Sequence, residues 1–101
     1  MRYIVDLDGT LCENIPNDGG DVYSVKPYLE RIEKLNKLYD EGNMIIIDTA
    51  RGSQTGFDHH KQTGKQLKNW GIKYHILRTG TKFFGDKYID DKGISDIDFF
   101  K

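Results

Sequence analysis

The N-terminal sequence RYIVDLDGT places two carboxylates, Asp6 and Asp8, two residues apart at the end of a short apolar run. Two residues of extended chain span about 6.5 Å and present their side chains on the same face. Asp and Gly also favour ordinary turns, so the motif alone has a purely structural interpretation. A calcium-binding loop counted from Asp6 is excluded, because it would need Gly at position six and Glu at position twelve, where Leu11 and Asn17 stand.

Polar residues also follow three further apolar stretches, each at the point where a strand would end. They are Asp48, Thr49, Ala50 and Arg51 after residues 44–47; Arg78, Thr79, Gly80, Thr81 and Lys82 after residues 72–77; and Asp90 and Asp91 after residues 87–89. Ligands of open α/β sheets bind outside the carboxyl ends of the strands, so these groups are expected to converge on one edge. Carboxylate oxygens suit Mg²⁺, and hydroxyl and ammonium groups donate hydrogen bonds to phosphate. The pattern therefore predicts a site for Mg²⁺ and a phosphate group.

The strands that must position these groups are expected over residues 2–5, 44–47, 72–77 and 87–89, which are rich in β-branched and aromatic residues. The continuously apolar sequence MIII at residues 44–47 is typical of a strand that is covered on both faces. Residues 11–24 contain Asn, Asp, Gly and Pro in close succession, which predicts a loop or a small hairpin.

Three helices are expected between and after these strands. The first begins near Pro27, because proline favours the first helical position, and it ends at Gly42. The second covers residues 58–70, and the third is a single turn over residues 95–100 with Ser95 as its cap. Strands that alternate with helices favour a parallel sheet with helices on both faces. The predicted fold class is therefore α/β, a three-layer α/β/α sandwich with a small parallel sheet.

The polar motifs, in this order along the chain, resemble those of the haloacid dehalogenase superfamily of phosphohydrolases. The similarity covers most of the chain, and its motifs are Asp6-Leu7-Asp8-Gly9-Thr10, Thr49, Lys82 and Asp90-Asp91. More narrowly, the segments VKPYLERIEKLNKLYDEGNMIIIDTARG and YIDDKGISDIDFF resemble small capless members associated with capsular polysaccharide biosynthesis. The resemblance implies a Rossmann-like core. The single loop and helix between the first motif and Thr49 leave no room for a cap domain.

This resemblance implies a Mg²⁺-dependent phosphomonoesterase that works through an aspartyl-phosphate. Asp6 would be the nucleophile, and Asp8 would protonate the leaving alkoxide and then deprotonate the attacking water. Thr49 would donate its hydroxyl to a phosphate oxygen, and Lys82 would neutralise the phosphate. The implied metal ligands are Asp6, Asp8, Asp90 and Asp91, and the implied substrate contacts are Gly9, Thr10, Ala50 and Arg51.

Some residues depart from the pattern of the superfamily or have no assigned role. Related sequences tend to show Gly-Lys-Pro where this chain has GTKF, so Lys87 is a rival to Lys82 as the motif lysine. Lys82 is favoured because Lys87 lies within an expected strand. Asp48 stands where an apolar residue is more usual, and its role stays open. His59 and His60 are expected at a solvated helix start, because adjacent helical residues face apart and do not share one metal ion.

Composition limits the class of protein further. The chain has 101 residues, which fits a single domain over residues 1–101. Its 15 Lys and Arg against 16 Asp and Glu give a net charge of −1, which argues against nucleic acid as a partner. Cys12 is the only cysteine, which suits a reducing compartment. No signal peptide or membrane-spanning run is visible, so we expect a cytoplasmic protein without a membrane partner.

The expected substrate is a small phosphorylated molecule, and the resemblance indicates a sugar or capsule precursor. An open site could also be covered by a second subunit of a homo-oligomer. A nucleotide or polynucleotide phosphatase is an alternative within the same chemistry. Another alternative is a receiver-like signalling domain, in which an aspartate after the middle strand accepts a phosphoryl group and the first acidic pair only binds metal. Asp48 after the second strand is a poor substitute for that acceptor, and the chain lacks a fifth strand-helix unit. A binding protein without turnover is a third.

Overall fold

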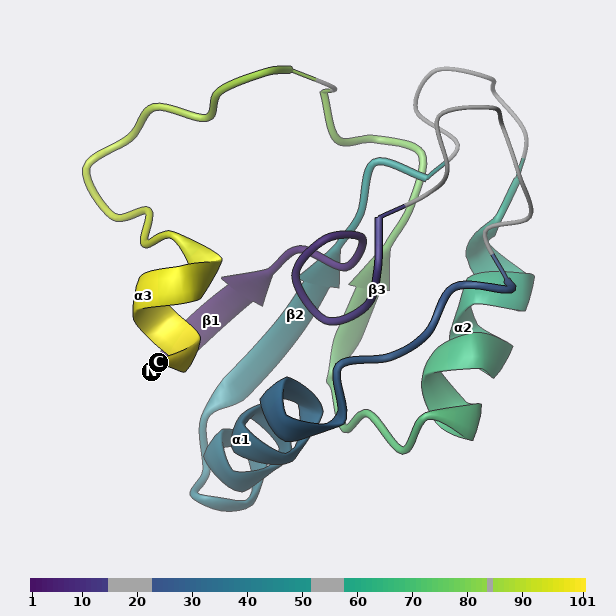
Figure 1. Cartoon of the computed structure of the whole chain (residues 1–101), viewed down its shortest axis with the longest axis horizontal. Helices are drawn as coiled ribbons and strands as arrows, with labels where there is room; N and C mark the ends of the chain where they lie inside the picture. The colour runs from purple at the N-terminus through teal and green to yellow at the C-terminus, as the bar shows by residue number, and fades with distance from the viewer. Residues whose placement is uncertain (15–22, 52–57, 84) are drawn as a thin grey trace.

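Three short parallel strands form the centre of the computed structural model, which describes residues 1–14, 23–51, 58–83 and 85–101 (Figure 1). The elements in chain order are β1 (Arg2–Val5), α1 (Leu29–Asp40), β2 (Met44–Asp48), α2 (His60–Asn69), β3 (Ile76–Arg78) and α3 (Asp96–Phe100). The strands lie in the order β1-β2-β3. The chain is therefore an α/β fold with a parallel sheet, as the alternation of strands and helices predicts.

The two faces of the sheet differ because side chains alternate along each strand. The register aligns Val5 of β1 with Ile47 of β2, and Ile47 with Leu77 of β3. Val5 and Ile47 are buried in one apolar cluster with Ile32 and Leu35 of α1 and Leu67 of α2, and Leu77 packs against that cluster. On the opposite face the aligned residues are Ile4, Ile46 and Ile76, and Ile4 remains 67% exposed.

The helix α1 follows directly from the apolar spacing of its sequence. Ile32 and Leu35 are buried, while Glu30, Glu33 and Lys37 of the same helix are exposed. The helix ends where expected, because Gly42 adopts a φ of 97°, a conformation that glycine tolerates and other residues rarely adopt. The expected start near Pro27 is two residues early, since the first helical residue is Leu29.

The helix α3 brings the C-terminal end of the chain beside β1. Ser95 caps it as predicted, because its hydroxyl accepts a hydrogen bond from the backbone N–H of Asp98. Arg31 of α1 forms an ion pair with Asp96 at 2.7 Å, and the rings of Tyr3 and Phe99 lie 5.8 Å apart. Since Tyr3 lies on the same side of the sheet as Val5, α3 packs on the face that α1 and α2 cover.

Two expectations about the sheet are wrong for the residues that the structure describes. Residues 87–89 form no strand, and Ile89 is 94% exposed. A three-residue run has few ladder hydrogen bonds to offer, and the flanking turn dominates: Asp90 accepts from the backbone N–H groups of Lys92 and Gly93. The expected strand over residues 72–77 is reduced to β3. The backbone N–H of His75 donates to the carbonyl of Ile45, but the N–H of Ile45 donates to Nδ1 of the same histidine and not to the main chain of residues 72–74, so the ladder does not extend further back.

The expected helices on the second face are likewise not found in the described part of the chain. Both crossovers, β1-α1-β2 and β2-α2-β3, advance along the sheet in one direction, and right-handed connections then place both helices on one side. Most of the loop expected over residues 11–24 falls on residues 15–22, which lie outside the described residues. None of the described helices is long and apolar enough to cross a lipid bilayer.

Candidate active site

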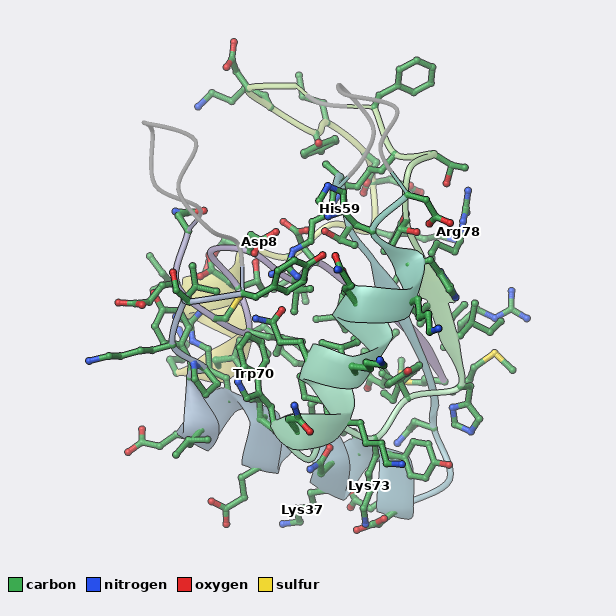
Figure 2. All side chains as sticks on the ribbon, turned by 90° about the vertical axis from the view of Figure 1, so that its right-hand side faces the viewer. Asp8, Lys37, His59, Trp70, Lys73 and Arg78 are labelled. Atoms are coloured by element: carbon green, nitrogen blue, oxygen red, sulfur yellow. The ribbon has the colours of Figure 1, made fainter. Side chains whose placement is uncertain are left out.

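The carboxyl ends of the three strands bring the predicted polar residues together at one edge of the sheet. Figure 2 shows Asp8, His59 and Arg78 at this end of the molecule, whereas Lys37 and Lys73 lie at the other end. Asp6 follows β1, Thr49 follows β2 and Thr79 follows β3. This placement agrees with the expectation that ligand-binding groups of an α/β sheet gather outside the carboxyl ends of the strands.

A tight loop after β1 fixes the first motif. The carbonyl of Leu7 accepts the N–H groups of Thr10 and Leu11, and the N–H of Gly9 donates to the carbonyl of Cys12 at 2.8 Å. Gly9 has a φ of 80°, and a Cβ at this position would stand only 2.5 Å from Oδ1 of Asn14. The backbone conformation therefore favours glycine here, whereas the Asn14 side chain could move aside. With Leu7 and Leu11 buried, the loop holds the backbone on either side of Asp8.

Asp6 is the open carboxylate of the pair and has a lysine beside it. Its side chain is 42% exposed, and Nζ of Lys82 lies 3.4 Å from Oδ1. The ring of Tyr88 lies 4.7 Å from the same ammonium group. The alternative lysine, Lys87, is exposed on the chain beyond. The structure thus brings Lys82 to the first motif, the lysine that the sequence favoured.

Asp8 is held far more tightly than Asp6. Nε of Arg51 donates to Oδ2 at 3.0 Å and Nη2 donates to Oδ1 at 2.7 Å, so the ion pair is bidentate. The Arg51 side chain is 0% exposed, and that of Asp8 is 15% exposed. Nη1 of Arg51 donates to Gln66 at 2.7 Å and to Thr63 at 3.3 Å. Arg51, expected as a substrate contact, therefore turns its guanidinium inward onto Asp8.

The other polar residues at the end of β2, Asp48 and Thr49, lie on opposite faces of the sheet. Thr49 is buried, and its hydroxyl accepts the backbone N–H of Arg51 at 3.2 Å. Asp48 aligns with Arg78 on the face opposite to Ile47. Its Oδ1 is buried with no hydrogen-bond partner among the described residues. Of the expected substrate contacts, Gly9, Thr10 and Ala50 are each partly exposed at this edge.

The four aspartates predicted as metal ligands do not come together in the described residues. Asp90 and Asp91 are exposed, and the carboxylate of Asp90 closes its own turn. Across residues 1–14, 23–51, 58–83 and 85–101, no three His, Cys, Asp or Glu side chains are grouped as a metal site. The reason is the missing strand over residues 87–89, because without it nothing carries Asp90 to the edge beside Asp6.

The two histidines face apart, as expected for adjacent residues at a helix start. Nδ1 of His59 lies 2.9 Å from the hydroxyl of Tyr23, and Nδ1 of His60 lies 3.3 Å from the hydroxyl of Thr79. The Tyr23 ring also stands 5.7 Å from the Arg51 guanidinium, so this loop residue covers the buried ion pair.

The sequence reasoning did not identify Thr63 and Gln66 as site residues. Both are buried, on a helix that is otherwise strongly polar on its exposed side. A signal was available, because Gln66 and the apolar Leu67 follow Thr63 by three and four residues, so the three residues share one side of the helix. Polar residues on the apolar face of a helix call for a buried partner, and that partner is Arg51.

Cys12 lies against Asp8, and we predict that its thiol is unreactive in the folded protein. Sγ stands 3.5 Å from Oδ1 of Asp8, and burial together with the charge of Asp8 raises the pKa of Cys12 to about 12. Only about 10⁻⁴ of the thiol is then ionised near pH 8. Iodoacetamide should therefore alkylate Cys12 rapidly in denaturant and negligibly without it, as measured by intact mass. Equal rates in both conditions would contradict the buried contact with Asp8.

Comparisons with known proteins support the fold and give no functional name. No protein-family model and no curated protein matches the sequence. A solved crystal structure of an MCSG target from Vibrio cholerae is similar, with a TM-score of 0.84 and 28% sequence identity. The match covers 98% of this chain and 86% of that chain. The whole chain therefore shares its architecture with a protein of known structure.

Proposed function

We propose that this protein is a phosphomonoesterase of the haloacid dehalogenase type, with Asp6 as its nucleophile. The observation that carries the proposal is the unequal environment of the two carboxylates. Asp6 is open to a ligand and has Lys82 at 3.4 Å, whereas Asp8 is fixed by a buried arginine. Paired acids in different environments are suited to different roles in one reaction.

In the first step, a carboxylate oxygen of Asp6 attacks the phosphorus of a phosphate ester, and the bond from phosphorus to the ester oxygen breaks. Asp8 enters this step protonated and gives its proton to the departing oxygen, so the product leaves as an alcohol. In the second step Asp8 takes a proton from water, and the water oxygen attacks the aspartyl-phosphate. Inorganic phosphate leaves and Asp6 is restored. The ammonium of Lys82 offsets the charge of the phosphoryl group next to Asp6.

The proposal includes Mg²⁺, although the described residues do not form the four-aspartate site expected from the sequence. Mg²⁺ in phosphoryl-transfer sites is held by one or two carboxylates and keeps several waters, and Asp6 is exposed enough to supply one. When bound, the ion would reduce the repulsion between Asp6 and the phosphate. The two steps above are written through the protein's own residues, and Asp90 and Asp91 stay proposed as further ligands.

The substrate class, the type of core, the cellular location and the oligomeric state are further parts of the proposal. A small phosphorylated sugar or polysaccharide precursor is the substrate class implied by the resemblance to capsule-associated members. The net charge of −1 gives no electrostatic attraction to a polynucleotide. We also propose the capless core of this superfamily, a cytoplasmic location, and a homo-oligomer that covers the open site.

Hydrolysis of phosphate esters should require a divalent cation. We expect the purified protein to release inorganic phosphate from p-nitrophenyl phosphate and from a panel of sugar, polyol and nucleotide phosphates in Mg²⁺. Excess EDTA should abolish this release, and added Mg²⁺ should restore it. Ca²⁺ should support little turnover, since its looser coordination misplaces the reacting groups. Full activity in EDTA would exclude the metal, and no release from any ester would exclude the enzyme.

A further inference from the structure

We infer that Gln66 and Thr63 of α2 are positioning residues that hold the proton-transfer carboxylate Asp8 through Arg51. The inference rests on the proposed function and adds residues that lie outside its motifs. Neither side chain touches Asp8, and their influence passes through the guanidinium that all three share.

The guanidinium of Arg51 is fixed from two opposite sides. Nε and Nη2 face the carboxylate of Asp8, and Nη1 faces the acceptors Gln66 and Thr63 on the helix. Because the group is planar and its donors form a rigid fork, fixing one nitrogen fixes the direction of the others. The helix α2 thereby sets the orientation of an aspartate that lies 58 positions before Gln66 in the sequence.

The contacts also distinguish the two oxygens of Asp8. Oδ1 accepts from Nη2 of Arg51 and also has Sγ of Cys12 at 3.5 Å, a thiol that is shared with the carbonyl of Leu7 at 3.6 Å. Oδ2 accepts only from Nε of Arg51 among the described contacts. A carboxylate oxygen offers about two acceptor positions. Oδ2 is therefore the oxygen that keeps a position for the transferred proton, and the geometry that Gln66 maintains is the one that presents Oδ2.

Stability alone is a poor explanation for this network. Buried ion pairs are often no more stable than apolar side chains of similar volume, because desolvation offsets the attraction. Gln66 is buried next to Leu67, at a position where helices more often carry an apolar residue. The network instead gives one defined orientation to a carboxylate at the open edge of the sheet, and a misplacement of about 1 Å can cost about 100-fold in rate.

The test compares Gln66→Met with Gln62→Met, a matched change on the exposed side of the same helix. Methionine keeps the length of the side chain and removes the acceptor for Arg51. An alkyl phosphate needs a proton on its leaving oxygen, whereas p-nitrophenyl phosphate needs little. We expect Gln66→Met to lower kcat/KM for the alkyl ester by about 10- to 100-fold and for the aryl ester by less than about 3-fold. Gln62→Met should leave both values unchanged.

Equal losses with both esters, or no loss with either, would overturn the positioning role. Gln66→Asn provides a second variant in case Gln66→Met is poorly folded, because it keeps a polar amide that is too short to reach Arg51. The far-ultraviolet circular dichroism and melting temperature of this variant report whether it is folded. It should also lose more kcat/KM with the alkyl ester than with the aryl ester. If the wild-type protein hydrolyses neither ester, the proposed function itself fails. If the wild-type protein hydrolyses the esters and Gln66→Met hydrolyses them at the same rates, only the positioning role of Gln66 fails.

Discussion

Asp6→Asn should reduce phosphate release from every ester to less than about 10⁻⁴ of the wild-type rate, as expected when a covalent nucleophile is lost. An amide does not attack phosphorus, and among the residues that the structure describes neither neighbouring carboxylate is placed to replace it. Asp8 is bound by Arg51 through both oxygens, and Oδ1 of Asp48 is buried on the other face of the sheet. The measurement is steady-state release of phosphate, in Mg²⁺, over the widest panel of esters that the wild-type protein hydrolyses.

Asp48→Asn is the matched control, because it makes the same chemical change at the end of the neighbouring strand. In a receiver-like domain the aspartate after the second strand would accept the phosphoryl group, and Asp48→Asn would then be the inactive variant. In the enzyme that we propose, Asp48→Asn keeps most of the activity. Asp6→Asn should also keep its fold, because the Asp6 side chain is 42% exposed and its ion pair with Lys82 is long at 3.4 Å. Turnover that survives in Asp6→Asn would show that the nucleophile has been wrongly assigned.

The parts of the fold that the sequence predicts correctly are those that local physics decides. The helix α1 has four apolar residues at helical spacing and a glycine at its end, and β2 has an unbroken run of apolar residues. Such elements form in most tertiary contexts. Residues 87–89 are a weaker case, because a three-residue strand exists only if a neighbour provides its hydrogen bonds. Nothing in their sequence competes with the turn that Asp90 and Gly93 form next to them.

The length of β3 depends on a contact that no local pattern contains. The backbone N–H of Ile45 could donate to the main chain of a neighbouring strand, yet it donates to the imidazole of His75 at 3.1 Å. This exchange shortens the ladder and delays the start of the strand to Ile76. A polar side chain that can accept a hydrogen bond near the start of a strand can replace a main-chain partner, and only the folded structure shows that it does.

The candidate site divides in the same way between local motifs and long-range contacts. Asp6, Asp8 and Thr49 follow predicted strands, so their convergence follows from the rule for parallel sheets. Lys82 required a choice between two lysines, and it is the one that lies 3.4 Å from Asp6. The role of Arg51 was not predictable, because a surface arginine and a buried one look alike in sequence. Its placement depends on Gln66, fifteen residues further along, and on the way α2 packs.

Asp8→Asn should act differently from Asp6→Asn, because it leaves the nucleophile in place and removes the proton transfer. General acid–base catalysis contributes about 10²–10⁴-fold, so kcat/KM for an alkyl or sugar phosphate should fall by about this factor. The loss with p-nitrophenyl phosphate should be smaller in the first step, since its leaving group is stable as an anion. Asparagine at position 8 keeps one oxygen for Arg51 and places an N–H₂ donor against the other side of the guanidinium. We therefore also expect a lower melting temperature.

The second step needs a base with either ester, so an aspartyl-phosphate should accumulate in Asp8→Asn during hydrolysis of p-nitrophenyl phosphate. Mass spectrometry after a rapid acid quench should find a phosphoryl adduct on the peptide that contains Asp6. The double variant Asp6→Asn with Asp8→Asn is the control and should carry none. An adduct on the peptide that contains Asp48 would favour the receiver-like domain. Equal losses with the alkyl and aryl esters would contradict proton transfer by Asp8, because only a group that protonates the leaving oxygen distinguishes between them.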